Sequence, residues 1–116
     1  MSAEYLPVDR VMALKKLMNN AELHQTLCGM FLQRYADAET VFGLWQTEEQ
    51  MAAARLLAHS LVSAASMIGA NQLSVLARQF ETALRKQELE QCPACSEAVR
   101  TELAKVMVCV RELYPA

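Results

Sequence analysis

His59 is the side chain of this sequence whose type and surroundings are best suited to chemistry. A neutral imidazole is a nucleophile near pH 7, because one ring nitrogen keeps a free electron pair. The other ring nitrogen carries the proton and needs an acceptor that holds the ring in one tautomer and orientation. Along a helix, Arg55, Val62 and Ser63 would be the neighbours of His59, and the small Ser63 leaves the imidazole accessible. The alternative is an ordinary surface histidine.

A second candidate is the CxxC motif from Cys92 to Cys95. It would suit a redox pair, because a thiolate near a helix start is stabilised. However, no βαβ pattern surrounds the motif, and a zinc site would need two more ligands. We therefore interpret it as a loop that starts the last helix. Cys28 and Cys109 lie in apolar helical segments and are expected to be small buried hydrophobes. His24 is expected to be structural or solvated.

The elements that must position these residues are predicted to be helices. Apolar residues recur at intervals of three and four, and no segment alternates apolar and polar residues as a strand does. Short connections between amphipathic helices favour antiparallel neighbours. The sequence therefore predicts an all-α fold, an up-down-up-down four-helix bundle in one domain of residues 1–116, with a short extra N-terminal helix over one end. The predicted order is a short helix from Val8 to about Asn19, a helix from about Ala21 to Trp45, a third helix ending at Gly69, a fourth from Asn71 to about Leu84, a loop from Gln87 to Cys95, and a fifth helix to Leu113.

The boundaries of the third helix have specific signals. Thr47 followed by Gln50 fits a capping box, in which each residue bonds the other's backbone. Gly69 is a good stop residue, because a helix often ends in a left-handed conformation that glycine adopts easily. Asn71 is a plausible N-cap for the fourth helix.

The periodicity of the third helix places His59 outside the core. The apolar stripe centres between Ala58 and Leu61, and His59 lies roughly 130° from that centre. His59 precedes the turn at Ala70 by eleven residues and Glu81 follows it by eleven, so an antiparallel pair brings them to the same height. We predict that Glu81 accepts a hydrogen bond from Nδ1–H of His59 and leaves Nε2 free to attack. A solvated helix residue is the alternative for Glu81.

The residues around and after this histidine form an ordered pattern of small residues, a glycine and spaced apolar residues. They are Ala58, His59, Leu61, Ser63, Ala64, Ala65, Gly69, Ala70, Leu73, Leu76, Phe80 and Glu81. This pattern, from Ala58 to about Arg85, resembles the histidine-containing phosphotransfer (HPt) domain of bacterial two-component phosphorelays. The stretch from Glu22 to Leu32 also resembles the second helix of that family, so the resemblance covers most of the chain.

The resemblance implies phosphotransfer, with His59 accepting a phosphoryl group from an aspartyl phosphate on a receiver domain and passing it to another receiver. The family has glutamate or glutamine at the position of Glu81, which agrees with the pairing predicted above. No metal or cofactor is expected here, because the Mg²⁺ would belong to the acidic site of the receiver. The expected receiver-docking face is the exposed surface around the phosphoacceptor: Ala52, Arg55, Leu56, Val62, Ser63 and Ser66.

Two positions depart from the family pattern. Val62 stands where the family usually has lysine, and Ser63 stands where it usually has glycine. Ser63 is small enough to let a partner approach. The lysine supplies positive charge beside the phosphoryl group, which Val62 cannot do, so that role is vacant or falls to Arg55.

Composition and missing motifs limit the partners. A net charge of −2 provides no electrostatic case for nucleic acid. No signal pattern opens the chain, so its four cysteines are expected to be reduced thiols in the cytoplasm. The stretch from Leu56 to Ala77 has no charged residue, but its histidine, amides and serines make it a poor membrane span. Without a P-loop or other nucleotide motif, the chain is expected to be a phosphocarrier with no ATP site of its own.

The resemblance also suggests the setting. It implies a monomer that meets response-regulator receivers and a cognate sensor kinase, either as a free-standing protein or as the terminal module of a hybrid sensor histidine kinase. The main rival hypothesis is a helical bundle that docks receiver or kinase domains without relaying phosphate. Val62 favours that rival, and His59 with Glu81 at matching height argues against it. A thiol-redox protein is the third hypothesis.

Overall fold

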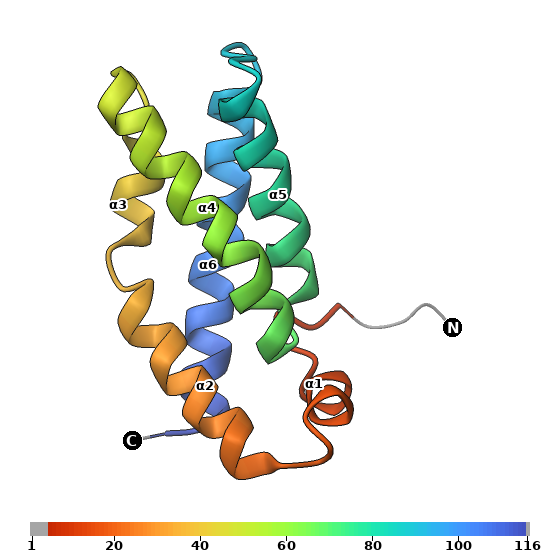
Figure 1. Cartoon of the computed structure of the whole chain (residues 1–116). Coiled ribbons are helices and arrows are strands. Elements are labelled where there is room, and N and C mark those ends of the chain that lie inside the picture. The colour runs from red at the N-terminus through yellow and green to blue at the C-terminus, as the bar shows by residue number, and fades with distance from the viewer. Residues whose placement is uncertain (1–4, 116) are drawn as a thin grey trace.

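Six α-helices make up the regular structure of residues 5–115, the part of the chain that this computed structural model describes (Figure 1). These residues contain no strand, so the all-α prediction is confirmed. The helices are α1 (Arg10–Lys16), α2 (Ala21–Arg34), α3 (Ala38–Gly43), α4 (Glu48–Ile68), α5 (Asn71–Arg85) and α6 (Cys92–Leu113).

The core lies between the long helices α4, α5 and α6 and the shorter α2 and α3, which follow one another along the bundle (Figure 1). An aromatic contact within the core joins α3 to α5, where the rings of Phe42 and Phe80 meet edge to face at 5.7 Å between centroids. Aromatic pairs in this arrangement contribute beyond their buried area. The short α1 packs near the end of α4, and the backbone N–H of Asp9 donates to the carbonyl of Gly69 at 2.9 Å.

Helix α4 has the apolar stripe that its sequence predicts. Ala54, Ala58, Leu61, Ala65 and Ile68 are all buried in the core. By length and composition alone α4 is apolar enough to cross a bilayer. The core helix of a globular domain passes the same test, because its buried face is just as apolar.

The predicted continuous helix from Ala21 to Trp45 is wrong. The chain forms α2 and α3 instead, separated by a turn from Tyr35 to Asp37. Asp37 is the N-cap residue of α3, a position that aspartate prefers to a helix interior. Periodicity could not reveal the break, because Phe31, Tyr35, Ala38 and Phe42 keep a 4-3-4 spacing across it and are all buried.

The predicted N-cap of the fourth helix is also wrong by one residue. Ala70 is the N-cap of α5, and Asn71 is its first helical residue. The cause lies at the end of α4, where Gly69 adopts a φ of 90° and the N–H of Ala70 donates to the carbonyl of Ala65 at 2.8 Å. This tight helix end leaves only Gly69 and Ala70 between the two helices. The side-chain amide of Asn71 contacts Sδ of Met12 instead.

The predicted loop from Gln87 to Cys95 is shorter than expected, because α6 begins at Cys92. Pro93 suggested a loop, but it lies in the first turn of α6. Proline is tolerated there, since the first N–H groups of a helix have no partner within it. The motif from Cys92 to Cys95 is therefore helical.

The capping box at the start of α4 is confirmed. The N–H of Gln50 donates to Oγ1 of Thr47 at 3.1 Å, and the N–H of Thr47 donates to Oε1 of Gln50 at 3.2 Å. We expect Thr47→Ala to lower the free energy of unfolding by about 1 kcal/mol, the usual cost of a lost cap. Urea denaturation measures this, and Thr47→Ser should restore most of the loss. An unchanged midpoint in Thr47→Ala would show that the box adds nothing to stability.

His24 is structural, one of the two interpretations its position allowed. Leu23, expected in the apolar stripe of this segment, is exposed instead, and His24 takes the buried position. Nε2 of His24 lies 3.0 Å from the carbonyl oxygen of Ile68, which can only accept, so Nε2 carries the proton. Nδ1 then accepts from the hydroxyl of Tyr114 at 2.6 Å. Both ring nitrogens therefore have hydrogen-bond partners, and His24 joins α2 to the end of α4 and to the residue after α6.

Candidate functional site

His59, near the middle of α4, and Glu81, about one turn before the end of α5, face each other across the α4–α5 hairpin. Nδ1 of His59 lies 3.4 Å from Oε1 of Glu81. The His59 side chain is 74% exposed and the Glu81 side chain only 14%. The distance is a few tenths of an ångström longer than a typical N–H···O hydrogen bond. A small rotation of the exposed imidazole would close that gap.

The two ring nitrogens of His59 have different surroundings. Glu81 is acidic and lies on the Nδ1 side, so Nδ1 is the nitrogen that can donate a proton toward it. Nε2 is on the opposite edge of an exposed ring. Oε2 of Glu81 lies 3.7 Å from Nε of Arg85, one helical turn further along α5, which helps to hold the carboxylate in place.

An open depression surrounds this pair. It is lined by His59, Val62, Ser63, Arg78, Glu81, Thr82 and Arg85. The two arginines come from α5 and were not singled out from the sequence. Arg55, the residue expected to replace the missing lysine, is exposed on α4 and does not line this depression. The basic residues beside His59 therefore come mainly from the neighbouring helix.

The residues expected to form the docking face lie on both sides of His59 along α4. Ala52, Arg55, Leu56 and Ser63 are exposed. Val62 and Ser66 are half-buried, and Ser66 is engaged, because its hydroxyl and carbonyl oxygens both accept from Nζ of Lys16.

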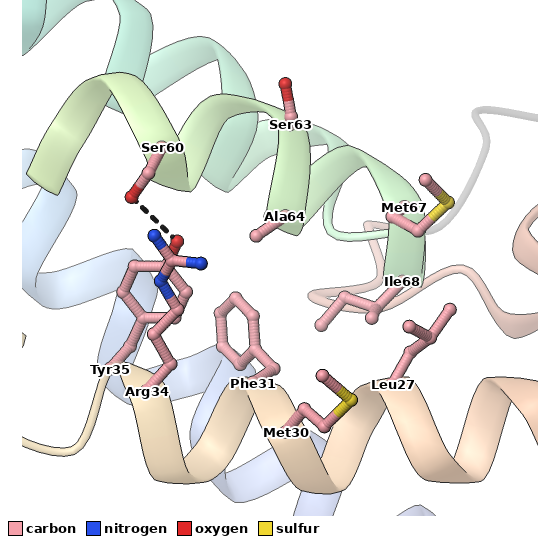
Figure 2. Close-up of a pocket in the computed structure, with 10 residues that line it drawn as sticks. All are labelled: Leu27, Met30, Phe31, Arg34, Tyr35, Ser60, Ser63, Ala64, Met67 and Ile68. Atoms are coloured by element: carbon pink, nitrogen blue, oxygen red, sulfur yellow. Dashed lines mark hydrogen bonds between the residues drawn. The ribbon is translucent and has the colours of Figure 1, made fainter.

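An apolar groove between α2 and α4 borders the same surface (Figure 2). Phe31 forms part of its floor, and the thioethers of Met30 and Met67 lie at its edges (Figure 2). Ser60 points into the groove and bonds the hydroxyl of Tyr35 at 2.9 Å, whereas Ser63 points away from it (Figure 2). The groove was not predicted from the sequence, because Met30 was assigned to the apolar stripe that faces the core, whereas its side chain is exposed.

The four cysteines are all free. Burial raises the pKa of Cys28 to about 11, with the nearby Cys109 thiol adding to the effect. Burial also raises the pKa of Cys92 and, together with the charge of Glu88, that of Cys95. Redox-active CxxC pairs depend on the opposite shift, a lowered thiol pKa. The pKa shifts therefore argue against the thiol-redox hypothesis.

Alkylation rates test this. We expect iodoacetamide at pH 7.5 to modify Cys92 and Cys95 several-fold more slowly in the native protein than in urea, because thiolate is the reactive form and burial disfavours it. As the pH is raised, the alkylation rate of the native protein should keep increasing at pH values where the rate in urea has become constant. Mass spectrometry of the peptide from α6 measures both rates. Faster alkylation in the native state would restore the redox hypothesis.

No metal site is evident between residues 5 and 115, where no three His, Cys, Asp or Glu side chains gather closely enough to hold an ion. What the site offers is an exposed imidazole, a carboxylate on its Nδ1 side and arginines at the rim of one depression.

These features define a class of protein: an all-α domain that presents one accessible histidine, with a carboxylate beside its Nδ1, on the outer face of a helix hairpin. The model of the Hpt domain family matches residues 16–107, and the chain belongs to that family. Membership indicates a histidine phosphotransfer role in a two-component phosphorelay, with receiver domains and kinases as partners. No curated protein and no solved structure matches the chain, so this assignment rests on the family match.

Proposed function

We propose that His59 is the phosphoacceptor, taking a phosphoryl group from the aspartyl phosphate of one receiver domain and passing it to another. The observation that carries the proposal is the contact of 3.4 Å between Nδ1 of His59 and Oε1 of Glu81, with the imidazole otherwise exposed. The only other histidine, His24, is fully buried and uses both ring nitrogens.

In the proposed step, the electron pair of Nε2 attacks the phosphorus of the aspartyl phosphate. The new N–P bond forms as the P–O bond to the aspartate breaks, and the electron pair of that bond leaves with the carboxylate. The ring of His59 becomes positively charged and keeps its proton on Nδ1. Glu81 stabilises that charge and holds the ring so that Nε2 points outward. The return transfer runs the same step in reverse.

The remaining features of the proposal concern partners and setting. The receiver docks on the face around His59, and the Mg²⁺ of the reaction belongs to the receiver. Phosphoryl transfer depends mainly on positioning and charge neutralisation, which a carrier and a receiver can share. Residues 1–116 act as a single monomeric domain in the cytoplasm, without an ATP site.

Labelling with phosphorylated receivers tests the proposal. A panel of receiver domains charged with ³²P is mixed with the purified protein. We expect a label that is lost in acid and kept in base, the behaviour of a phosphoramidate, and that maps to the peptide containing His59. An acid-stable label, or one on another residue, would contradict the proposal.

A docking module without relay activity is the second candidate, and Val62 is the observation that favours it. Binding separates the two candidates. If receivers bind the face around His59 but no member of a broad panel transfers label, docking replaces relay as the function.

Glu81→Ala is expected to slow labelling about tenfold. A hydrogen bond to a charged group contributes about 1.5–3 kcal/mol, and each 1.4 kcal/mol is tenfold in rate. The high exposure of His59 places the effect at the lower end of that range. Glu81→Gln should recover part of the rate, since its amide oxygen still accepts from Nδ1–H but carries no charge. Initial rates of transfer from the fastest receiver give the comparison, and equal rates for the Ala variant and the native protein would remove Glu81 from the mechanism.

A further inference from the structure

Positive charge is missing from α4 at the place where the family usually has it. Val62 lies one turn after His59, on the side of α4 that faces the depression. An apolar side chain there cannot balance the charge of a phosphoryl group on Nε2. The depression nevertheless has basic residues, and both come from α5.

The register of the hairpin places Arg78 opposite Val62. His59 and Glu81 face each other at equal distances from the turn at Ala70, and moving three residues along each helix toward the turn gives Val62 and Arg78. A hydrogen bond one turn nearer the hinge joins the same two helices. The hydroxyl of Ser74, one turn before Arg78 on the same face of α5, donates to the carbonyl of Val62 at 2.8 Å.

Arg78 is also available for a ligand. Its side chain is exposed and forms no ion pair with any residue between 5 and 115, whereas Arg85 is engaged by Glu81 at 3.7 Å. Arg78 lines the depression around His59 and the adjoining one that contains Val62, Ser66 and Lys16. Arg78 therefore lies where the two depressions meet, next to the one that contains His59.

We propose that Arg78 is the phosphoryl-binding residue of this site and supplies from α5 the charge that Val62 cannot supply from α4. The planar guanidinium donates to two phosphoryl oxygens at once, a geometry that suits arginine better than lysine. The inference rests on the proposed function of His59 and deepens it.

Two phosphoryl donors are compared. A negative result for the role of Arg78 can then be distinguished from a negative result for the relay between receivers. The first is a phosphorylated receiver. The second is phosphoramidate, a small donor that needs no docking face. With it, the P–N bond breaks as Nε2 of His59 forms its own bond to phosphorus, and the electron pair of the broken bond leaves with the nitrogen as ammonia. ³¹P NMR follows the phosphohistidine signal in time.

Four variants provide the comparison with the native protein. Arg78→Ala should slow phosphorylation of His59 roughly tenfold with either donor, the effect of losing an exposed charge-assisted hydrogen bond in the transition state. Arg78→Lys should recover part of the rate. Adding Val62→Lys to Arg78→Ala should also recover it, since this returns the charge to α4. The matched control Arg111→Ala removes the same charge from the last turn of α6 and should label at the native rate.

The outcomes are decisive in either direction. Slower phosphorylation of Arg78→Ala by phosphoramidate supports the inference even if no receiver labels the native protein, in which case only the relay fails. Native rates in Arg78→Ala with phosphoramidate overturn it. Equal decreases in phosphorylation rate for Arg78→Ala and Arg111→Ala also overturn it, because the change in net charge alone would then explain the effect. Absence of any phosphohistidine at His59 in the native protein overturns both proposals.

Discussion

Replacing His59 with glutamine is expected to abolish phosphoryl labelling completely while leaving stability almost unchanged. Glutamine is polar and flexible, but its amide nitrogen has no electron pair available for attack. The native side chain is 74% exposed, so its removal costs the core nothing and should shift the free energy of unfolding by less than about 0.5 kcal/mol. No other imidazole can substitute, because His24 is inaccessible.

The measurement combines ³²P transfer from the fastest receiver with urea denaturation of the same samples. Thr101→Ala is a suitable comparison, because it alters the exposed surface of α6 and leaves the imidazole and the docking face in place. It should keep its label. Acid-labile phosphate remaining on the His59→Gln variant would mean that another residue is the acceptor.

Gly69→Ala is expected to have the largest effect on stability. Gly69 has a φ of 90°, a left-handed conformation that costs an L-residue about 1–2 kcal/mol. An added Cβ would also overlap the carbonyl oxygen of Asp9 and lie 3.1 Å from Cβ of Ala13. The segment before α1 would have to move, and the hydrogen bond from Asp9 to Gly69 would be lost. We expect a total loss of about 3 kcal/mol and a fall in Tm of roughly 10 °C.

Gly29→Ala is the matched control, because it makes the same chemical change inside α2. An added Cβ there meets nothing within 4 Å. Alanine is the better helix former, so this variant should gain about 0.5–1 kcal/mol. Differential scanning calorimetry of both variants checks the pair of expectations. If both shift Tm in the same direction, the contact between Gly69 and the Asp9 segment does not contribute as the structure suggests.

Much of the fold was predictable because local signals and burial agree. The stripe of α4, the capping box at Thr47 and the stop at Gly69 each depend on residues close together in the chain. The proximity of His59 and Glu81 was predicted as well, since a two-residue turn leaves little freedom in the register of the hairpin. The same register places Arg78 of α5 opposite Val62, whereas Arg55, predicted from the spacing along α4, does not line the depression.

The parts that sequence reasoning missed depend on contacts between distant segments. The break at Tyr35 keeps the apolar spacing intact, so the pattern alone cannot show it. His24 is buried because it finds both the carbonyl of Ile68 and the hydroxyl of Tyr114, partners that lie far along the chain. Whether a polar side chain on an apolar helix face finds hydrogen-bond partners depends on which groups the tertiary structure places beside it.

By itself, the sequence determined that the chain is helical, where α4 begins and ends, and which histidine faces solvent, because helical periodicity and caps are local properties. The tertiary structure decided which side chains surround that histidine. The rim of the depression is built from two helices, and the position of Arg78 relative to His59 follows from how α5 packs on α4. Packing between helices, rather than spacing along one of them, is what places charge beside the imidazole.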